Sequence, residues 1–240
     1  MRTMPPSLLC VEQLEISCQE DGKWTPIVQD VSFQLYPGEM VTLTGPSGCG
    51  KSLTAHAIVG LLEAGWRVTN GRIRYQDKQI LDLDSRGRQK LRREEIGLLI
   101  QDSLHGLNPI QTVKKQMVET LLQQKRKISK KERDIYLHSL LLQVGFRDPA
   151  SVLASYPFEL SGGMRQRVLL AMMVSLHPKI LIADEPTTAL DMINREKVLS
   201  LLKRLQHDLG LTVLLISHDQ QSVQRFADRI IRMERGGMVR

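Results

Sequence analysis

The segment at residues 45–52, which reads GPSGCGKS, restricts the possible folds of this chain more than any other feature. It fits the pattern G-x-x-x-x-G-K-[ST] in full, between a short β-rich run at 40–44 and a predicted helix at 52–62. In that order the glycines let backbone N–H groups turn inward around phosphate oxygens, and the helix directs its positive end at them. The competing interpretation, an ordinary glycine turn before a helix, accounts for neither the full pattern nor its position.

Two side chains of this segment have the chemistry of a nucleotide site. The ammonium group of Lys51 can reach the β- and γ-phosphates, and the hydroxyl of Ser52 can bind Mg²⁺. The residues predicted to contact the nucleotide here are Gly45, Pro46, Ser47, Gly48, Cys49, Gly50, Lys51, Ser52 and Leu53. By itself the loop predicts nucleotide binding and names no reaction.

The composition fits one aliphatic globular domain. The chain has 240 residues, of which 42% are hydrophobic and only 4% aromatic, and no apolar run approaches the roughly 18 residues that span a bilayer. Its first residues lack the apolar stretch of a signal peptide, and its three cysteines form no metal-binding pattern, so we expect a cytosolic protein. The net charge of +7 is dispersed, and the basic run at 125–131 is typical of a solvated helix face, so nucleic-acid binding is not predicted.

Short apolar runs alternate with segments of helical period along the rest of the chain. The predicted strands are 11–17 at a sheet edge, 31–35, 40–44, 96–100, 179–183 and 211–216, and the predicted helices are 52–62, 112–144, 163–176 and 194–209. The repeated strand–helix order predicts an α/β fold with parallel central strands. A helix-rich stretch at about 102–160 interrupts that order and indicates an inserted helical subdomain.

Polar residues follow three of the apolar strands. Asp184 and Glu185 end the strand at 179–183, where two carboxylates are unfavourable beside a buried strand unless they have a function. In an enzyme with a phosphate loop the first acid typically orders Mg²⁺ and the second orients or deprotonates water. An acidic helix cap is the weaker alternative, because Pro186 and two threonines follow. Gln101 and His218 also follow buried strands, and taken alone each is equally well a surface or a structural residue.

The order of these motifs resembles that of the ATP-binding subunits of ABC transporters, over nearly the whole chain. The sequence LSGGM at 160–164 is similar to the ABC signature, residues 45–52 to Walker A, and residues 180–185 to Walker B with its catalytic glutamate. Gln101 occupies the Q-loop position, ALD at 189–191 the D-loop position, and His218 the switch position. The resemblance implies an α/β fold with a P-loop NTPase core, an ABC-type nucleotide-binding domain at 1–240. Its ATP-binding core would lie at about 1–101 and 161–240, with a β-rich N-terminal subdomain, and its α-helical subdomain at about 102–160.

The resemblance also implies that ATP is bound between two subunits. Ser161, Gly162 and Gly163 would contact the γ-phosphate of ATP held by the opposite subunit, and Asp191 would act across the same interface. A phosphate group between subunits is stabilised by positive dipoles from both sides, and a closed dimer supplies them.

The remaining motifs would carry the chemistry, with ATP and Mg²⁺ as ligands. Glu185 would polarise the attacking water, His218 would stabilise the γ-phosphate, and Gln101 would sense that phosphate and relay its presence to a membrane partner. The residues implied as Mg²⁺ ligands are Ser52, Gln101 and Asp184.

Residues 107–109, 156–167 and 183–191 resemble those of importers of dipeptides, oligopeptides and nickel. Within that group, residues 50–54 and 64–71 are similar to the nickel-import subunit of the first type. Such a subunit would lie on the cytoplasmic face of the inner or plasma membrane, as a peripheral protein. Its implied partners are a second, related but non-identical ATP-binding subunit, two transmembrane permease subunits and an extracytoplasmic solute-binding protein, with no nucleic acid. The alternatives are a soluble ABC ATPase acting on nucleic acid or ribosomes, and a non-hydrolysing partner in a heteromeric pair.

The sequence departs from the family pattern in two places. Relatives often stack adenine on an aromatic residue where this chain has Cys18, and Trp24 nearby is equally well a substitute or a loop residue. Relatives also often continue past a strand like the one near Gly237, so no role of such an extension is assigned.

Overall fold

The computed structural model describes residues 6–100, 106–123, 129–188 and 190–239. An antiparallel sheet near the N-terminus has the strand order β2-β1-β4-β5. Its strands are β1 (Leu9–Glu20), β2 (Lys23–Leu35), β4 (Trp66–Tyr75) and β5 (Lys78–Gln79). A tight turn with positive φ at Asp21 and Gly22 joins the first two strands, as the sequence at 21–23 predicts.

A second sheet of six strands has the order β10-β9-β3-β8-β7-β6. Its strands are β3 (Met40–Thr44), β6 (Ile96–Leu99), β7 (Ile180–Asp184), β8 (Thr212–Ser217), β9 (Arg229–Glu234) and β10 (Gly237–Met238). All neighbours are parallel except β10 and β9. The prediction of parallel central strands is thus confirmed.

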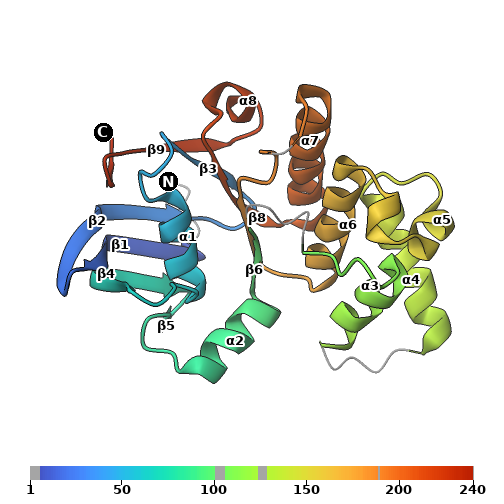
Figure 1. Cartoon of the computed structure of the whole chain (residues 1–240), viewed down its shortest axis with the longest axis horizontal. Helices are drawn as coiled ribbons and strands as arrows, with labels where there is room; N and C mark the ends of the chain where they lie inside the picture. Colours follow the sequence, from blue (N-terminus) through green and yellow to red (C-terminus); the bar gives the residue numbers. More distant parts are fainter. Residues whose placement is uncertain (1–5, 101–105, 124–128, 189, 240) are drawn as a thin grey trace.

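Helices surround the two sheets, as Figure 1 shows. They are α1 (Lys51–Val59), α2 (Ser85–Glu94), α3 (Val113–Leu122), α4 (Lys130–Gln143), α5 (Pro149–Ala154), a 3₁₀ turn (Pro157–Glu159), α6 (Gly162–Ser175), α7 (Met192–Leu209) and α8 (Gln220–Gln224). The helices α3 to α6 group on the far side of the second sheet from β1, β2 and β4 (Figure 1). Within the described ranges, no helix is both long and apolar enough to cross a bilayer.

The central strands divide the protein into two hydrophobic cores, because side chains alternate between the faces of a strand. On β7, Ile180 and Ile182 pack with the antiparallel sheet and α1, whereas Leu181 and Ala183 pack with α6, α7 and the inserted helices. All five residues of β7 are buried. The alternation places Asp184, the last residue of the strand, on the same face as Ile180 and Ile182, which is the face that α1 covers.

Two sequence predictions about elements are wrong. The strand predicted at the edge, 11–17, lies between β2 and β4, because β4 was not recognised among its charged residues. The helix predicted at 112–144 is two helices, α3 and α4, of which α4 begins with a capping box formed by Ser129 and Glu132. Such a box satisfies backbone N–H groups at a helix start, so the polar residues at 129–132 mark a new helix. The subdomain boundaries near 101 and 161 stay a prediction.

Candidate nucleotide-binding site

The glycine-rich segment forms a loop between β3 and α1, as predicted. Gly45 has a φ of 154°, and a Cβ atom there would lie 2.0 Å from the carbonyl oxygen of Met233, so only glycine fits. Helix α1 begins after Gly50, which has a left-handed backbone and makes no side-chain capping hydrogen bond. The first N–H groups of α1 thus have no side-chain cap, which suits them to bind the oxygens of a phosphate group.

The ammonium group of Lys51 lies over this loop. Its Nζ donates hydrogen bonds to the carbonyl oxygens of Gly45 and Pro46, each at 2.9 Å, and lies 3.8 Å from the sulfur of Cys49. Lys51 is only 5% exposed. A buried cation held by two carbonyl dipoles is pre-positioned for an anion at the same place. The side chain of Leu53, two residues further on, packs against the hydrophobic core, and its predicted contact with the nucleotide stays a prediction.

Ser52 and Asp184 meet although they lie 132 residues apart in the chain. The hydroxyl of Ser52 donates to Oδ1 of Asp184 at 3.0 Å. Oxygen ligands of this kind suit Mg²⁺, which is often bound through one or two protein groups together with phosphate oxygens and water. Within the described ranges, no group of three His, Cys, Asp or Glu residues is placed to hold a metal ion. The pair of Ser52 and Asp184 nevertheless fits Mg²⁺, and the third predicted ligand, Gln101, lies outside the described residues.

Burial perturbs the Asp184 carboxyl group, which is 2% exposed. Desolvation raises the pKa of Asp184, and the negative charge of Glu185 adds to that effect, while the hydroxyl of Ser52 opposes it. A carboxyl group whose pKa is raised in the folded state stabilises the protein below its unfolded pKa and loses that contribution as the pH rises through the folded pKa. Above that folded pKa, the carboxylate of Asp184 therefore destabilises the nucleotide-free fold.

We expect Asp184→Asn to stabilise the nucleotide-free protein at pH 7. The amide keeps an oxygen for the Ser52 hydroxyl and removes the buried charge, so a gain on the order of 1 kcal/mol would raise Tm by about 2–4 °C. Thermal unfolding at pH 7 and near pH 4 measures the effect, which should shrink at the lower pH as Asp184 becomes protonated. Asp82→Asn, at an exposed position, is the matched control. A lower Tm for Asp184→Asn at pH 7 would contradict the argument.

Glu185 and His218 are also brought together, from the ends of β7 and β8. The Nδ1 atom of His218 lies 2.8 Å from both carboxylate oxygens of Glu185, and its backbone N–H donates to Oε1 at 3.0 Å. The hydroxyl of Thr188 donates to Oε2 at 2.9 Å. The carboxylate of Glu185 is thus held in one orientation beside the imidazole ring of His218.

The backbone at Glu185 is unusual. Its φ is +49°, in the left-handed region that non-glycine residues rarely adopt, and its N–H donates to the carbonyl oxygen of Ile216 on β8. Such strain persists only where surrounding contacts impose it, and it is found most often at functional sites. The turn after β7 thereby presents Glu185 to the edge where α1 begins, since Asp184 beside it bonds Ser52.

The signature and D-loop residues lie at the starts of two other helices. Ser161 caps α6 by accepting from the N–H of Met164, and Asp191 caps α7 by accepting from the backbone and side chain of Asn194. These hydrogen bonds lower the pKa of Asp191. Figure 1 shows α6 and α1 on opposite sides of the central strands, so the signature does not meet the phosphate loop of its own chain.

Two contacts around these motifs were missed by sequence reasoning. Thr188 orients Glu185, and its only signal was its position three residues beyond that acid. Asn194 packs so close to Gly163 that a Cβ atom added there would lie 3.3 Å from its side-chain oxygen. Gly163 is thus the glycine that allows α6 and α7 to approach each other. A contact between helices leaves no such local signal in the sequence.

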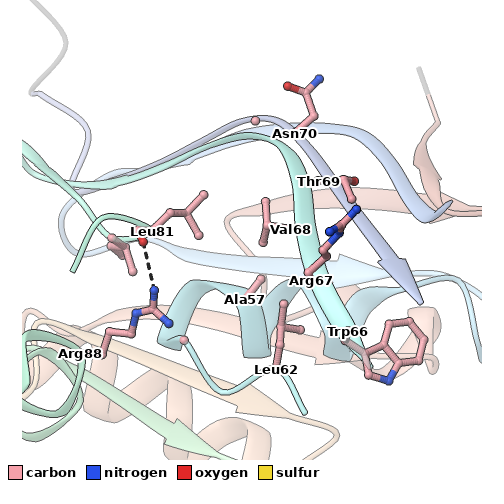
Figure 2. Close-up of a pocket in the computed structure, with 12 residues that line it drawn as sticks. Ala57, Leu62, Trp66, Arg67, Val68, Thr69, Asn70, Leu81 and Arg88 are labelled. Atoms are coloured by element: carbon pink, nitrogen blue, oxygen red, sulfur yellow. Dashed lines mark hydrogen bonds between the residues drawn. The ribbon is translucent and has the colours of Figure 1, made fainter. Parts of the chain in front are cut away.

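The structure also bears on the aromatic residues considered for adenine. The guanidinium of Arg67 covers the ring of Trp24, with its carbon 3.8 Å from the ring centroid. Cys18 pairs with Thr25 and Trp66 on the neighbouring strands. Trp66 borders a cavity of about 420 Å³ that Figure 2 shows between β4, Arg88 and the C-terminal end of α1. That cavity lies at the opposite end of α1 from the phosphate loop and is separate from this site.

Comparisons with known proteins agree with this geometry. Residues 28–188 match the family described as ABC transporter. The chain is 42% identical to the dipeptide transport ATP-binding protein DppD of Bacillus subtilis, covering 96% of this chain and 69% of that protein. It is 40% identical to the oligopeptide transport ATP-binding protein AppD of the same organism, covering 89% of this chain and 65% of that protein.

A solved structure shares the whole fold. It is the dimeric post-hydrolysis state of the ATP-binding cassette MJ0796 bound to ADP and Pi, with a TM-score of 0.82, 29% identity and 97% of each chain covered. The family match extends over more than half of the chain, and the match to the solved structure covers 97% of it. The chain therefore belongs to the ABC transporter family and has the fold of its ATP-binding cassettes.

Proposed function

We propose that this chain is the ATP-hydrolysing subunit of an importer that takes up peptides. The observation that carries the proposal is the convergence of three segments at one edge of the parallel sheet. The phosphate loop supplies Lys51 and Ser52, the end of β7 supplies Asp184 and Glu185, and the end of β8 supplies His218. A phosphate-binding loop beside an oriented carboxylate is what hydrolysis of a phosphoanhydride by water requires.

In this proposal each side chain has one task. Lys51 and the N–H groups of α1 bind the phosphate oxygens of ATP. Ser52 and Asp184 would hold Mg²⁺, which when bound would neutralise charge on those oxygens. Glu185 orients water for attack on the γ-phosphorus and draws on its proton. His218, which is half exposed, leaves Glu185 to bond the γ-phosphate when ATP is present. Gln101 keeps its predicted role as a sensor of the γ-phosphate.

The site is proposed to be completed by a second ATP-binding subunit. Within one chain, α6, at whose start Ser161, Gly162 and Gly163 lie, and α1, which follows the phosphate loop, are on opposite sides of the central strands (Figure 1). The similar cassette described above is dimeric. A signature from the partner would place its helix N-terminus opposite α1, so that ATP lies between two positive helix ends. Asp191 would lie near that interface. We expect the partner to be related rather than identical.

The cargo is proposed from the relatives, which are named for dipeptide and oligopeptide transport. Neither is named for nickel, so nickel stands second as the cargo. Uptake needs permease subunits and a solute-binding protein, and we place this chain on the cytoplasmic side of the membrane with them. The same relatives do not favour a soluble ATPase acting on nucleic acid or ribosomes.

We expect Lys51→Ala to lower uptake of a labelled dipeptide at least about tenfold in cells, because transport stops when ATP is not hydrolysed. Uptake of ⁶³Ni in the same strain tests the second cargo. Lys90→Ala, which removes a lysine that is 73% exposed on α2, is the control and should leave uptake unchanged. If neither dipeptide nor nickel uptake falls in Lys51→Ala, the importer proposal is wrong for both cargoes.

A further inference from the structure

A second groove, of about 760 Å³, lies away from the phosphate loop. It is formed where the turn between α4 and α5 meets α6 and α7. Its cationic lining consists of Arg147 on that turn, Arg167 on α6, and Lys197 and Arg204 on α7. Neither the proposed hydrolysis of ATP nor the predicted motifs assign a role to this groove, although Gly163 of the signature borders it.

Two of these cationic side chains, Arg167 and Arg204, stabilise the fold through hydrogen bonds to backbone carbonyl groups. Nε and Nη1 of Arg167 donate to the carbonyl oxygens of Gly163 and Gly145, and Nη2 of Arg204 donates to that of Gln143, the last residue of α4. Cations at the C-terminal end of a helix are favourable because the carbonyl groups there carry partial negative charge. A Cβ atom on Gly145 would lie 3.8 Å from Arg167 and 3.9 Å from Arg204, so both guanidinium groups flank one residue.

The carbonyl groups at the C-terminal end of α4 do not neutralise the four positive charges that line the groove. Among the described residues, no ion pair joins Arg147, Arg167, Lys197 or Arg204 to a carboxylate. The acid that lines the groove, Glu196, already pairs with Arg225 at 3.0 Å. Burial lowers the pKa of Arg167, which is the direction expected for a cation without a counter-charge. Like charges gathered without an anion repel one another, so an anion bound there would relieve that repulsion.

We propose that this groove binds a small compound that carries two or more phosphate groups. Guanidinium groups match phosphate oxygens with paired hydrogen bonds, and four cations suit a multiply charged ligand better than a single carboxylate. The volume lies in the range of sites for small molecules. Because the groove borders both Gly163 on α6 and Asn194 on α7, its occupant would contact the helices that begin with the signature and the D-loop.

Binding of sodium tripolyphosphate, measured by calorimetry, tests this proposal. The measurements use the 240-residue chain carrying Lys51→Ala, which weakens the phosphate loop as a competing site. In that background, adding Arg147→Ala and Lys197→Ala should lower the affinity at least about tenfold, since each charged hydrogen bond contributes strongly to binding. Both side chains are exposed, and no hydrogen bond joins them to other described residues, so the fold should be kept.

The control removes the same charge elsewhere, through Arg86→Ala and Lys115→Ala at exposed positions on α2 and α3. It should change the affinity less than about twofold, because distant surface charges are screened by salt. Absence of tripolyphosphate binding, or an equal loss in both double variants, would overturn the proposal. Because no hydrolysis is measured, either outcome is independent of whether the chain energises an importer.

The phosphate groups could belong to a soluble compound or to a lipid headgroup. Sedimentation with phosphatidylcholine vesicles that contain cardiolipin, a lipid with two phosphates, separates the two sources. Sedimentation that falls with Arg147→Ala and Lys197→Ala, and not with the control pair, identifies a headgroup. Sedimentation that is equal in both pairs, together with the calorimetric loss, identifies a soluble compound.

Discussion

Glu185→Gln is expected to lower ATP hydrolysis by roughly 100-fold or more while ATP binding is kept. The amide retains the size of the carboxylate and an oxygen for the hydroxyl of Thr188, which lies 2.9 Å from Oε2. It cannot draw on the proton of water, and it lacks the charge that orients water beside His218. The variant should therefore hold ATP without turning it over.

Two measurements check this expectation. Release of phosphate by the assembled transporter reports hydrolysis, and size-exclusion chromatography with ATP should show a stable ATP-bound pair of cassettes for Glu185→Gln. Glu63→Gln, at an exposed position, is the matched control and should hydrolyse ATP at the normal rate. Normal hydrolysis by Glu185→Gln would show that another group activates the water.

Lys51→Ala is expected to weaken ATP binding as well as hydrolysis, with a loss of turnover of about 100-fold or more. The lysine is 5% exposed and its Nζ is held between the carbonyl oxygens of Gly45 and Pro46. A cation fixed in this way needs no reorganisation when phosphate binds, and alanine leaves the phosphate oxygens without that charge. The two variants thus differ in kind, because Lys51 acts on the bound nucleotide and Glu185 on the water.

Titration with a fluorescent ATP analogue measures the affinity for nucleotide and so distinguishes the effect of Lys51→Ala from that of Glu185→Gln. Affinity should fall for Lys51→Ala and stay near normal for Glu185→Gln. Circular dichroism verifies that Lys51→Ala is folded, since the substitution also removes two hydrogen bonds, and Lys90→Ala on the surface of α2 is the control. Unchanged affinity in the folded Lys51→Ala protein would remove Lys51 from the nucleotide site.

The elements that were predicted well have strong local signals. Strands β7 and β8 are runs of apolar residues buried on both faces, and the loop between β3 and α1 has a full motif. Strand β4 was missed because half of its residues are exposed and because Asn70 and Gly71, which are typical of turns, interrupt the alternation of its apolar residues. Helix α2 was missed because it has little apolar surface, with Leu91 as its only buried residue.

In the candidate site, too, the sequence indicated what has a local signal and missed what depends on contacts between distant segments. The sequence indicated Ser52, Asp184, Glu185 and His218 one at a time, each as the residue after a strand or loop. Taken alone, His218 stayed undecided, because a histidine after a buried strand is often structural, and only the family resemblance gave it a role. The structure shows that His218 contacts Glu185, both through its backbone N–H and through its ring.

By itself the sequence determined the phosphate loop, the alternation of strands and helices, and the family resemblance, because each depends on residues close together in the chain. The tertiary structure decided which of these residues meet. Ser52 reaches Asp184 across 132 residues because β3 and β7 both pair with β8, so the ends of these parallel strands gather at one edge of the sheet. The cationic groove likewise depends on how α4, α6 and α7 pack, and contacts between distant segments follow from that packing rather than from any local pattern.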